Sequence, residues 1–156
     1  MRSVPLLVAV AALVVVLVAL PRCGRRAGPP ALRASWTLTP GVLNPDVRQA
    51  TIRSTICVRG WTRTIRPPSD YTSRLKLEQM RAYRLSGKPG DFQEDHLISL
   101  ELGGHPTDPR NLWPEPYPRA ADVDAIENEL NAAVCSGRMS LYAAQIRESE
   151  LKHTKG

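Results

Sequence analysis

The positions of apolar residues divide the chain into three parts. Residues 4–20 are almost entirely apolar. Residues 27–43 are rich in proline, glycine and small side chains, and we expect them to form a linker. Periodic patterns of apolar and polar residues begin at about Asn44, so the pattern predicts a folded domain at residues 44–156.

Two helices are expected in the first half of this domain. Asn44, Pro45 and Asp46 are typical of a helix start, with a capping side chain, a proline in the first turn and an acidic residue close behind. The short helix that follows should end before Gly60. A second helix is expected at about residues 73–85, where apolar residues recur at helical spacing.

A strand, a loop and a return strand are expected in the middle of the domain. The first strand covers about Phe92 to Leu97, and the loop contains Gly103 and Gly104. The return strand is Asn111 to Trp113, and Pro114 should stop it because proline lacks the backbone N–H.

Two helices should complete the chain. The clearer one covers about residues 120–135 and carries a stripe of apolar residues at helical spacing. A last helix begins near Ser140, and the charged residues 148–156 are expected to fray. The sequence therefore predicts an α+β domain that is small and mostly helical.

The apolar segment at residues 4–20 has the length of a signal-peptide core or of a short membrane anchor. Three arginines follow it and one precedes it, which by the positive-inside tendency opposes export, and no clean small-x-small cleavage site is present. We interpret residues 1–26 as a signal peptide or an N-terminal membrane anchor. The domain is then expected to be exported: secreted, periplasmic or held at the outer face of the membrane.

The charge of the chain changes when residues 1–26 are left out. They hold four of the 21 basic residues and none of the 15 acidic ones, so 17 and 15 remain and the net charge falls from +6 to +2. Residues 27–90 carry eleven basic and three acidic residues, and residues 91–156 carry six and twelve. A basic half beside an acidic half suits a protein that binds phosphates and a cation, although ordinary solvated surface gives the same pattern.

Cys57 and Cys135 form an even pair once Cys23 is assigned to the N-terminal segment. In an exported domain we expect such a pair to form a disulfide, whereas in a cytosolic domain the two would be separate thiols. The bridge would close a loop of about 80 residues and add about 4.5 kcal/mol to the free energy of unfolding.

The middle of the domain carries residue types suited to phosphodiester hydrolysis. That reaction needs a base to activate water and a cation to neutralise charge at the phosphate. Asp95 and His96 end the first strand, the Gly103–Gly104 loop follows, and Asn111 opens the return strand. The run from Glu94 to Pro116, EDHLISLELGGHPTDPRNLWPEP, resembles the active-site hairpin of HNH-type (ββα-metal) nucleases.

The resemblance implies a ββα-metal finger at about residues 91–135, with a role for each of three residues. His96 would be the general base, Asp95 a metal ligand, and Asn111 the residue that holds His96 in orientation, which fixes the nitrogen that accepts the proton. It also implies one divalent metal ion, Mg²⁺ or Mn²⁺. The alternative for Asp95 and His96 is an ordinary pair of residues at the end of a strand.

A further metal ligand is expected on the helix at about residues 120–135, where the family usually has His or Asn. Glu127 and Asn131 are four residues apart and share a face that borders the apolar stripe, so we prefer them. Asp124 lies further round the helix and ranks third. Solvated helix surface is the equal alternative for these side chains.

Other polar residues have weaker assignments. The basic residues expected to contact phosphate are Arg59, Arg63, Arg66, Arg74, Lys76 and Arg110. Glu94 is expected either behind the metal ligands or on an exposed part of the strand, and Glu115 either near the metal or near the start of the following helix. His105 is expected at the surface of the loop, and His153 is expected to have no catalytic role.

The sequence therefore predicts an exported, metal-dependent nuclease acting on DNA, and on RNA as a further substrate, with little sequence selectivity since no recognition module is evident. The expected partners are a nucleic acid and, through the N-terminal segment alone, a membrane; no protein partner is evident. Two alternatives stay open. One is a non-catalytic exported binding or structural domain on the same scaffold, and the other is a phosphodiesterase for another anionic polymer or small nucleotides.

Overall fold

The computed structural model describes residues 32–155, so the signal peptide or anchor expected at residues 1–26 lies outside the described residues. The part of the expected linker that is described, residues 32–43, lies on the body of the domain. The Ala34 N–H donates to the Lys152 carbonyl oxygen at 3.0 Å, and Thr39 is fully buried.

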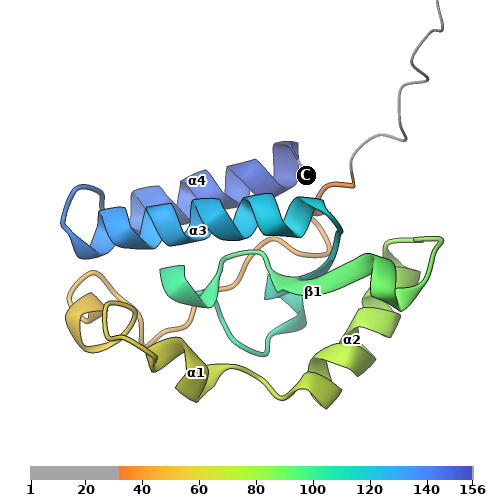
Figure 1. Ribbon diagram of the computed structural model, residues 1–156, viewed down its shortest axis with the longest axis horizontal. Coiled ribbons are helices and arrows are strands. Elements are labelled where there is room, and N and C mark those ends of the chain that lie inside the picture. Colours follow the sequence, from red (N-terminus) through yellow and green to blue (C-terminus); the bar gives the residue numbers. More distant parts are fainter. Residues whose placement is uncertain (1–31, 156) are drawn as a thin grey trace, which may run out of the picture.

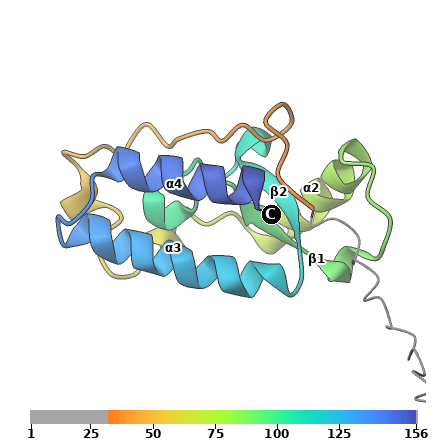
Figure 2. The ribbon, with the colours of Figure 1, turned by 90° about the horizontal axis from the view of Figure 1, so that it is seen from above.

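A two-stranded hairpin lies between two groups of helices (Figures 1 and 2). Strands β1 (Phe92–His96) and β2 (Leu112–Pro116) are antiparallel, and α3 (Arg119–Cys135) and α4 (Leu141–Thr154) lie side by side on one side of them, while α2 (Ser69–Ala82) packs on the other. The short helical segments are η1 (Ile52–Ser54), α1 (Trp61–Ile65), η2 (Pro89–Asp91), η3 (Leu100–Leu102) and η4 (Pro109–Asn111). The prediction of a small, mostly helical α+β domain with a strand–loop–strand–helix order is confirmed.

The return strand is longer than expected. It runs from Leu112 to Pro116, so the predictions that it begins at Asn111 and that Pro114 stops it are wrong; Asn111 is the last residue of η4. The Leu97 N–H donates to the Asn111 carbonyl oxygen, and from this pair onward hydrogen-bonded and non-hydrogen-bonded residue pairs alternate along the two strands. Pro114 and Pro116 occupy non-hydrogen-bonded positions, where the backbone nitrogen points away from β1. The missing N–H therefore costs no hydrogen bond between the strands.

The helix expected between Asn44 and Gly60 is wrong: the structure has turns there and only the three residues of η1 in helical form. Side chains compete with the backbone for its hydrogen bonds. Asn44 Oδ1 accepts from the Asp46 N–H at 3.0 Å, and the Thr51 hydroxyl accepts from the Arg48 N–H at 2.8 Å. Such local bonds favour turns over a helix.

The expected later helices are present. Helix α2 begins earlier than predicted, at Ser69 directly after two prolines, and α3 agrees closely with its predicted range. The Ser140 hydroxyl accepts from the Ala143 N–H at 3.2 Å and caps α4. The prediction that residues 148–156 fray is wrong, because α4 continues to Thr154.

The main core joins the two long helices to the N-terminal turns and the hairpin loop. Its buried residues are Val47, Ile52, Ile56, Ile98, Leu102, Leu130, Val134, Leu141 and Ala144. The predicted disulfide between Cys57 and Cys135 is confirmed, with 5.5 Å between the two Cα atoms. It ties the end of α3 to the segment before α1 and so fixes one side of the helix that carries two of the candidate site residues.

Candidate active site

His96 ends β1 and is 5% exposed. Its Nε2 lies 3.0 Å from the carbonyl oxygen of Pro106. A carbonyl oxygen can only accept, so Nε2 carries the proton and Nδ1 keeps a free lone pair. Burial lowers the pKa of His96, and the Pro106 carbonyl and the Asp95 charge offset this only in part. The imidazole is therefore neutral at neutral pH, as a base requires.

Asn111 is fully buried and holds the loop between the two strands. Its Oδ1 accepts from the Ile98 N–H at 3.0 Å, and its Nδ2 donates to the carbonyl oxygens of Ile98 and His105, both at 3.0 Å. Among the described residues no hydrogen bond joins it to the His96 ring. Asn111 is linked to the ring only through the backbone, since its partner His105 precedes Pro106, whose carbonyl oxygen contacts His96.

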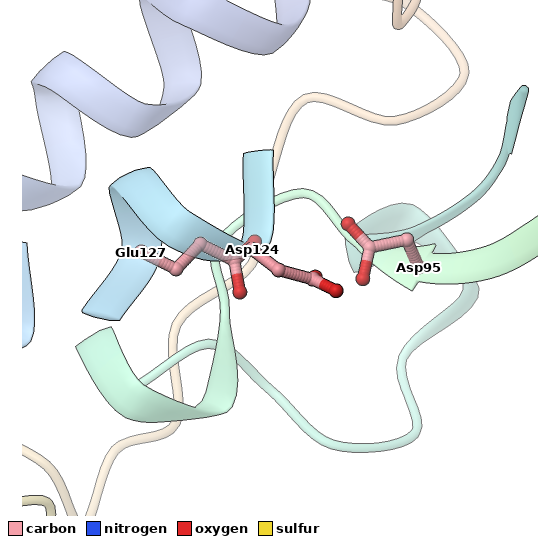
Figure 3. Close-up of side chains that lie close together, drawn as sticks. All are labelled: Asp95, Asp124 and Glu127. Atoms are coloured by element: carbon pink, nitrogen blue, oxygen red, sulfur yellow. The ribbon is translucent and has the colours of Figure 1, made fainter. Parts of the chain in front are cut away.

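Three carboxylates meet beside the end of β1 (Figure 3). Asp95 comes from β1, and Asp124 and Glu127 come from α3; one oxygen of each lies within 4.8 Å of the others. Oxygen donors alone, and carboxylates in particular, are the set that Mg²⁺ and Mn²⁺ prefer. The residues present therefore fit the divalent cation that the sequence predicts, although an acidic cluster alone does not show that a metal binds.

The same carboxylates line a cavity of about 260 Å³ together with His96 and Arg66. Arg66 follows α1 directly and is exposed. Its positive charge acts on Asp124, whose pKa burial raises, and on His96. Of the six basic residues expected to contact phosphate, Arg66 is the one that the structure brings to this cavity.

The other five lie elsewhere. Arg59 and Arg63 are exposed next to and in α1, Lys76 Nζ donates to the Phe92 carbonyl oxygen at 3.0 Å, and Arg74 and Arg110 pair with Asp70 and Asp108 at 3.0 and 2.7 Å. These positions do not converge on the carboxylates.

Asn131 was preferred as a metal ligand, but the structure does not bring it to the cluster. Its Nδ2 donates to the carbonyl oxygens of Glu101 at 2.8 Å and Ile56 at 3.3 Å, so it joins α3 to the core. The end of β1 lies beside α3 about one helical turn N-terminal to Asn131. Asp124 and Glu127, three residues apart, face the cavity there.

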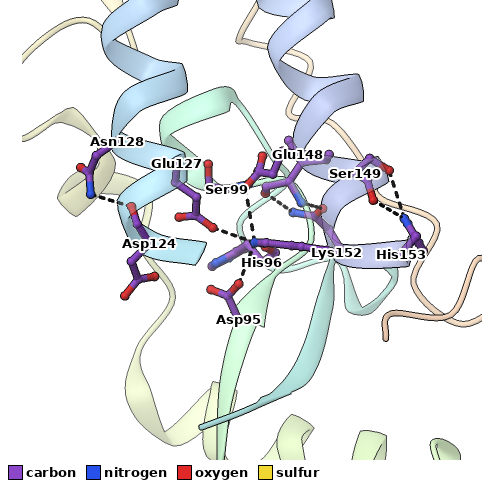
Figure 4. Close-up of polar contacts among 12 residues, drawn as sticks. Asp95, His96, Ser99, Asp124, Glu127, Asn128, Glu148, Ser149, Lys152 and His153 are labelled. Carbon is purple, nitrogen blue, oxygen red and sulfur yellow. Dashed lines mark hydrogen bonds and ion pairs between the residues drawn. The ribbon is translucent and has the colours of Figure 1, made fainter. Parts of the chain in front are cut away.

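Lys152, which the sequence does not predict as a site residue, lies behind Asp95 and Glu127 on the buried side of the cluster (Figure 4). Its Nζ is 2.7 Å from Asp95 Oδ2, 2.7 Å from Glu127 Oε1 and 3.3 Å from Glu148 Oε1, and it also donates to the His96 carbonyl oxygen. Glu148 in turn accepts from the Ser99 N–H with both carboxylate oxygens, at 3.0 and 3.1 Å.

A signal for these two residues exists in the sequence. Leu141 and Ala144 begin the buried face of α4, and the same helical spacing continues to Glu148 and Lys152. Oppositely charged side chains four residues apart pair with each other, and on the buried face of a helix this pattern indicates a buried ion pair as well as a solvated one.

The charges in the cluster interact strongly. Burial opposes ionisation of Asp95, but the Lys152 charge and hydrogen bond prevail and hold the pKa of Asp95 below its usual value. Glu127 behaves in the opposite way, because burial raises its pKa to about 9. The charge of Lys152 lowers this pKa, and the charges of Asp95 and Glu148 raise it. Asp95 is thus the ionised member of the pair that Lys152 contacts.

The strands carry two further buried carboxylates. Glu115 is fully buried, and burial, with the Asp95 charge, raises its pKa to about 8. Burial also raises the pKa of Glu94 to about 8. Within residues 32–155 neither carboxylate accepts a hydrogen bond from an N–H or hydroxyl group, and the oxygens of both are shielded from solvent. The polar group that meets Glu115 there is the Asp95 carboxylate.

The two remaining histidines lie outside the cavity. His105 Nδ1 accepts from the Asp108 N–H at 3.0 Å and shapes the loop. His153 is buried, with Nε2 3.0 Å from the Thr39 carbonyl oxygen and its ring stacked on Trp36 at 3.6 Å between centroids. Both have structural contacts that use their ring nitrogens.

Comparison of the chain with protein-family models, with curated proteins and with solved structures finds no match. Between residues 32 and 155, every helix is too short or too polar to cross a lipid bilayer.

Proposed function

We propose that this chain is a metal-dependent nuclease that hydrolyses phosphodiester bonds of DNA, with RNA as a further substrate. One observation carries the proposal: a buried, neutral His96 with a free Nδ1 shares a cavity with Asp95, Asp124 and Glu127. A base beside a set of oxygen ligands is what metal-assisted hydrolysis requires.

In the proposed reaction, His96 Nδ1 accepts a proton from water. The water oxygen forms a bond to phosphorus while the bond from phosphorus to the leaving oxygen breaks, and that oxygen takes a proton from solvent. Asn111 and the Pro106 carbonyl keep Nε2 protonated and the ring in place.

Asp95, Asp124 and Glu127 would hold Mg²⁺ or Mn²⁺, which when bound neutralises charge on the phosphate. Arg66 lines the same cavity and offers a planar group of N–H donors that matches the oxygens of a phosphate. We expect low sequence selectivity, because the contacts proposed here are with the phosphate and not with the bases.

The test is cleavage of supercoiled plasmid by the purified full-length protein with Mg²⁺ or Mn²⁺. His96→Ala should reduce the rate by about 10²- to 10⁴-fold, because it removes the base. Arg138→Ala, an exposed change outside the cavity, serves as the control and should leave the rate unchanged. A folded His96→Ala protein that cuts at the wild-type rate would rule out this mechanism.

One observation favours the second candidate, a non-catalytic exported binding domain. The Lys152 ammonium already supplies a positive charge to Asp95 and Glu127, so the fold has a cation at the cluster without a metal. Calorimetric titration with Mn²⁺ separates the two candidates, since a domain that only binds a partner needs no metal affinity at these carboxylates.

A further inference from the structure

We propose that Lys152 is a positioning residue for the metal centre. From the buried side it holds one oxygen of Asp95 and one of Glu127 (Figure 4). Both carboxylates would thereby present their remaining oxygens to the cavity that they line, where the divalent cation would bind. This inference rests on the proposed function and assigns a role to a residue of α4.

The contacts of Lys152 exclude direct action on a substrate. Its side chain is fully buried. An ammonium has three N–H donors, and the Asp95 carboxylate, the Glu127 carboxylate and the His96 carbonyl oxygen take all three. A phosphate in the cavity would find no free donor on Lys152.

The carboxylates have an inner and an outer side. The side chains of Asp95 and Glu127 keep 11% and 12% exposure, and both line the cavity. Asp124, the third carboxylate of the cluster, is exposed and has no ion pair with Lys152. The cavity side of the cluster is thus free of Lys152, and a cation can bind there without displacing it.

Lys152 also joins three elements that the hairpin alone does not hold together. Asp95 belongs to β1, Glu127 to α3, and Lys152 to α4. No other side chain between residues 32 and 155 forms ion pairs with both Asp95 and Glu127. Without the ammonium no side chain in this part of the chain would bridge the two groups, and their separation would depend on backbone packing alone.

The test variant is Lys152→Met combined with Glu148→Gln, which removes one positive and one negative charge and leaves the net charge of the cluster unchanged. Glutamine at position 148 can still accept from the Ser99 N–H. In calorimetric titration of the full-length protein with Mn²⁺ alone, we expect the Kd to rise about 10- to 100-fold, the usual effect of losing a residue that orients metal ligands. Lys155→Met, an exposed lysine of the same helix end, should bind Mn²⁺ like the wild type.

A folded double variant with the wild-type Kd would overturn the positioning role while leaving the proposed function intact. A wild-type protein that binds no Mn²⁺ would overturn both, and the two failures are thereby distinguished. Circular dichroism establishes whether the double variant is folded.

A measurement on the wild-type protein does not depend on the variant. With ¹⁵N-labelled lysine, the buried Lys152 ammonium should give a slowly exchanging NMR signal that persists and shifts at saturating Mg²⁺. Loss of that signal to fast exchange with water would mean that the metal displaces Lys152, and would overturn the inference.

Discussion

The loop between β1 and β2 and the C-terminal turns of α4 both bring buried polar groups to one site. The two regions differ in how far along the sequence the hydrogen-bond partners of these groups lie. Asn111 bonds to Ile98 and His105, which are 13 and 6 residues away. Lys152 bonds to Asp95 and Glu127, which are 57 and 25 residues away. The loop is held largely by its own residues, although the Val42 N–H also donates to Asn111 Oδ1 at 3.4 Å, whereas the end of α4 is satisfied only when other elements are in place.

The difference has an energetic consequence. A neutral amide in a local loop loses little when distant parts of the protein shift. A buried ammonium pays a large desolvation cost, and its removal or the removal of a partner leaves an uncompensated charge that costs about 3–5 kcal/mol. We therefore expect the loop to depend on local shape and the end of α4 to depend on the whole fold.

The largest effect is expected from deletion of residues 148–156, since it removes Glu148, Lys152 and His153, all of them buried. The loss should exceed about 5 kcal/mol, because the charge cost adds to lost packing. Thermal melting of the full-length and shortened proteins measures it, and deletion of residues 155–156 alone is the control. An unchanged melting temperature would mean that the end of α4 does not contribute to the fold.

Gly104→Ala tests the loop. A Cβ at this position would lie 1.7 Å from the Ile98 carbonyl oxygen and 2.6 Å from Asn111 Nδ2, so backbone has to move. We expect a loss of about 4 kcal/mol in the free energy of unfolding, measured in urea. Gly90→Ala is the matched control, because no atom lies within 4 Å of its added Cβ. Similar unfolding of the two variants would contradict the tight closure of the loop.

A smaller effect is expected from pH, through the strand carboxylates. Glu94 and Glu115 have pKa values raised to about 8 from the usual 4.5, so the folded protein holds their protons more tightly than the unfolded chain. The stability they contribute is complete below about pH 4.5 and is lost as pH rises through about 8. Asp95, with a lowered pKa, acts oppositely and loses its contribution at acid pH.

The melting temperature of the metal-free protein should therefore be highest near about pH 5 and fall toward about pH 8. Differential scanning calorimetry across this range measures the slope, and Glu94→Gln should flatten it. A melting temperature that rises between these values would show that the strand carboxylates ionise freely.

The smallest change in stability is expected at Asp124, and comparison with Asn131 tests which of these two α3 residues binds the metal. Asp124→Ala should weaken Mn²⁺ binding about tenfold or more and change the free energy of unfolding by less than about 0.5 kcal/mol, because Asp124 is exposed. Asn131→Ala should cost about 1–3 kcal/mol through its lost bonds to Glu101 and Ile56 and leave the Mn²⁺ affinity unchanged. The opposite pattern would restore Asn131 as the ligand.

Part of this protein was determined by sequence alone. The strands, the glycine loop, α3, the start of α4 and the Cys57–Cys135 pair follow from local patterns: alternation, helical spacing, a capping serine and an even number of cysteines. The same patterns do not predict residues 44–60 correctly. There the Asn44 and Thr51 side chains accept hydrogen bonds from backbone N–H groups, and the chain forms turns instead of a helix.

Only the tertiary structure decided how the site is assembled. Helical spacing predicts that Glu127 and Asn131 share one face of α3. The end of β1 lies beside Asp124 and Glu127 instead, and these two carboxylates meet Asp95. Lys152 belongs to a charged C-terminal segment, and it is buried because two carboxylates from other elements, Asp95 and Glu127, and Glu148 of its own helix surround its ammonium. Helical spacing marks the buried face of α4 that carries Lys152, but the cost of burying its charge is recovered largely by Asp95 and Glu127, which are distant in sequence, so only the tertiary structure shows these partners.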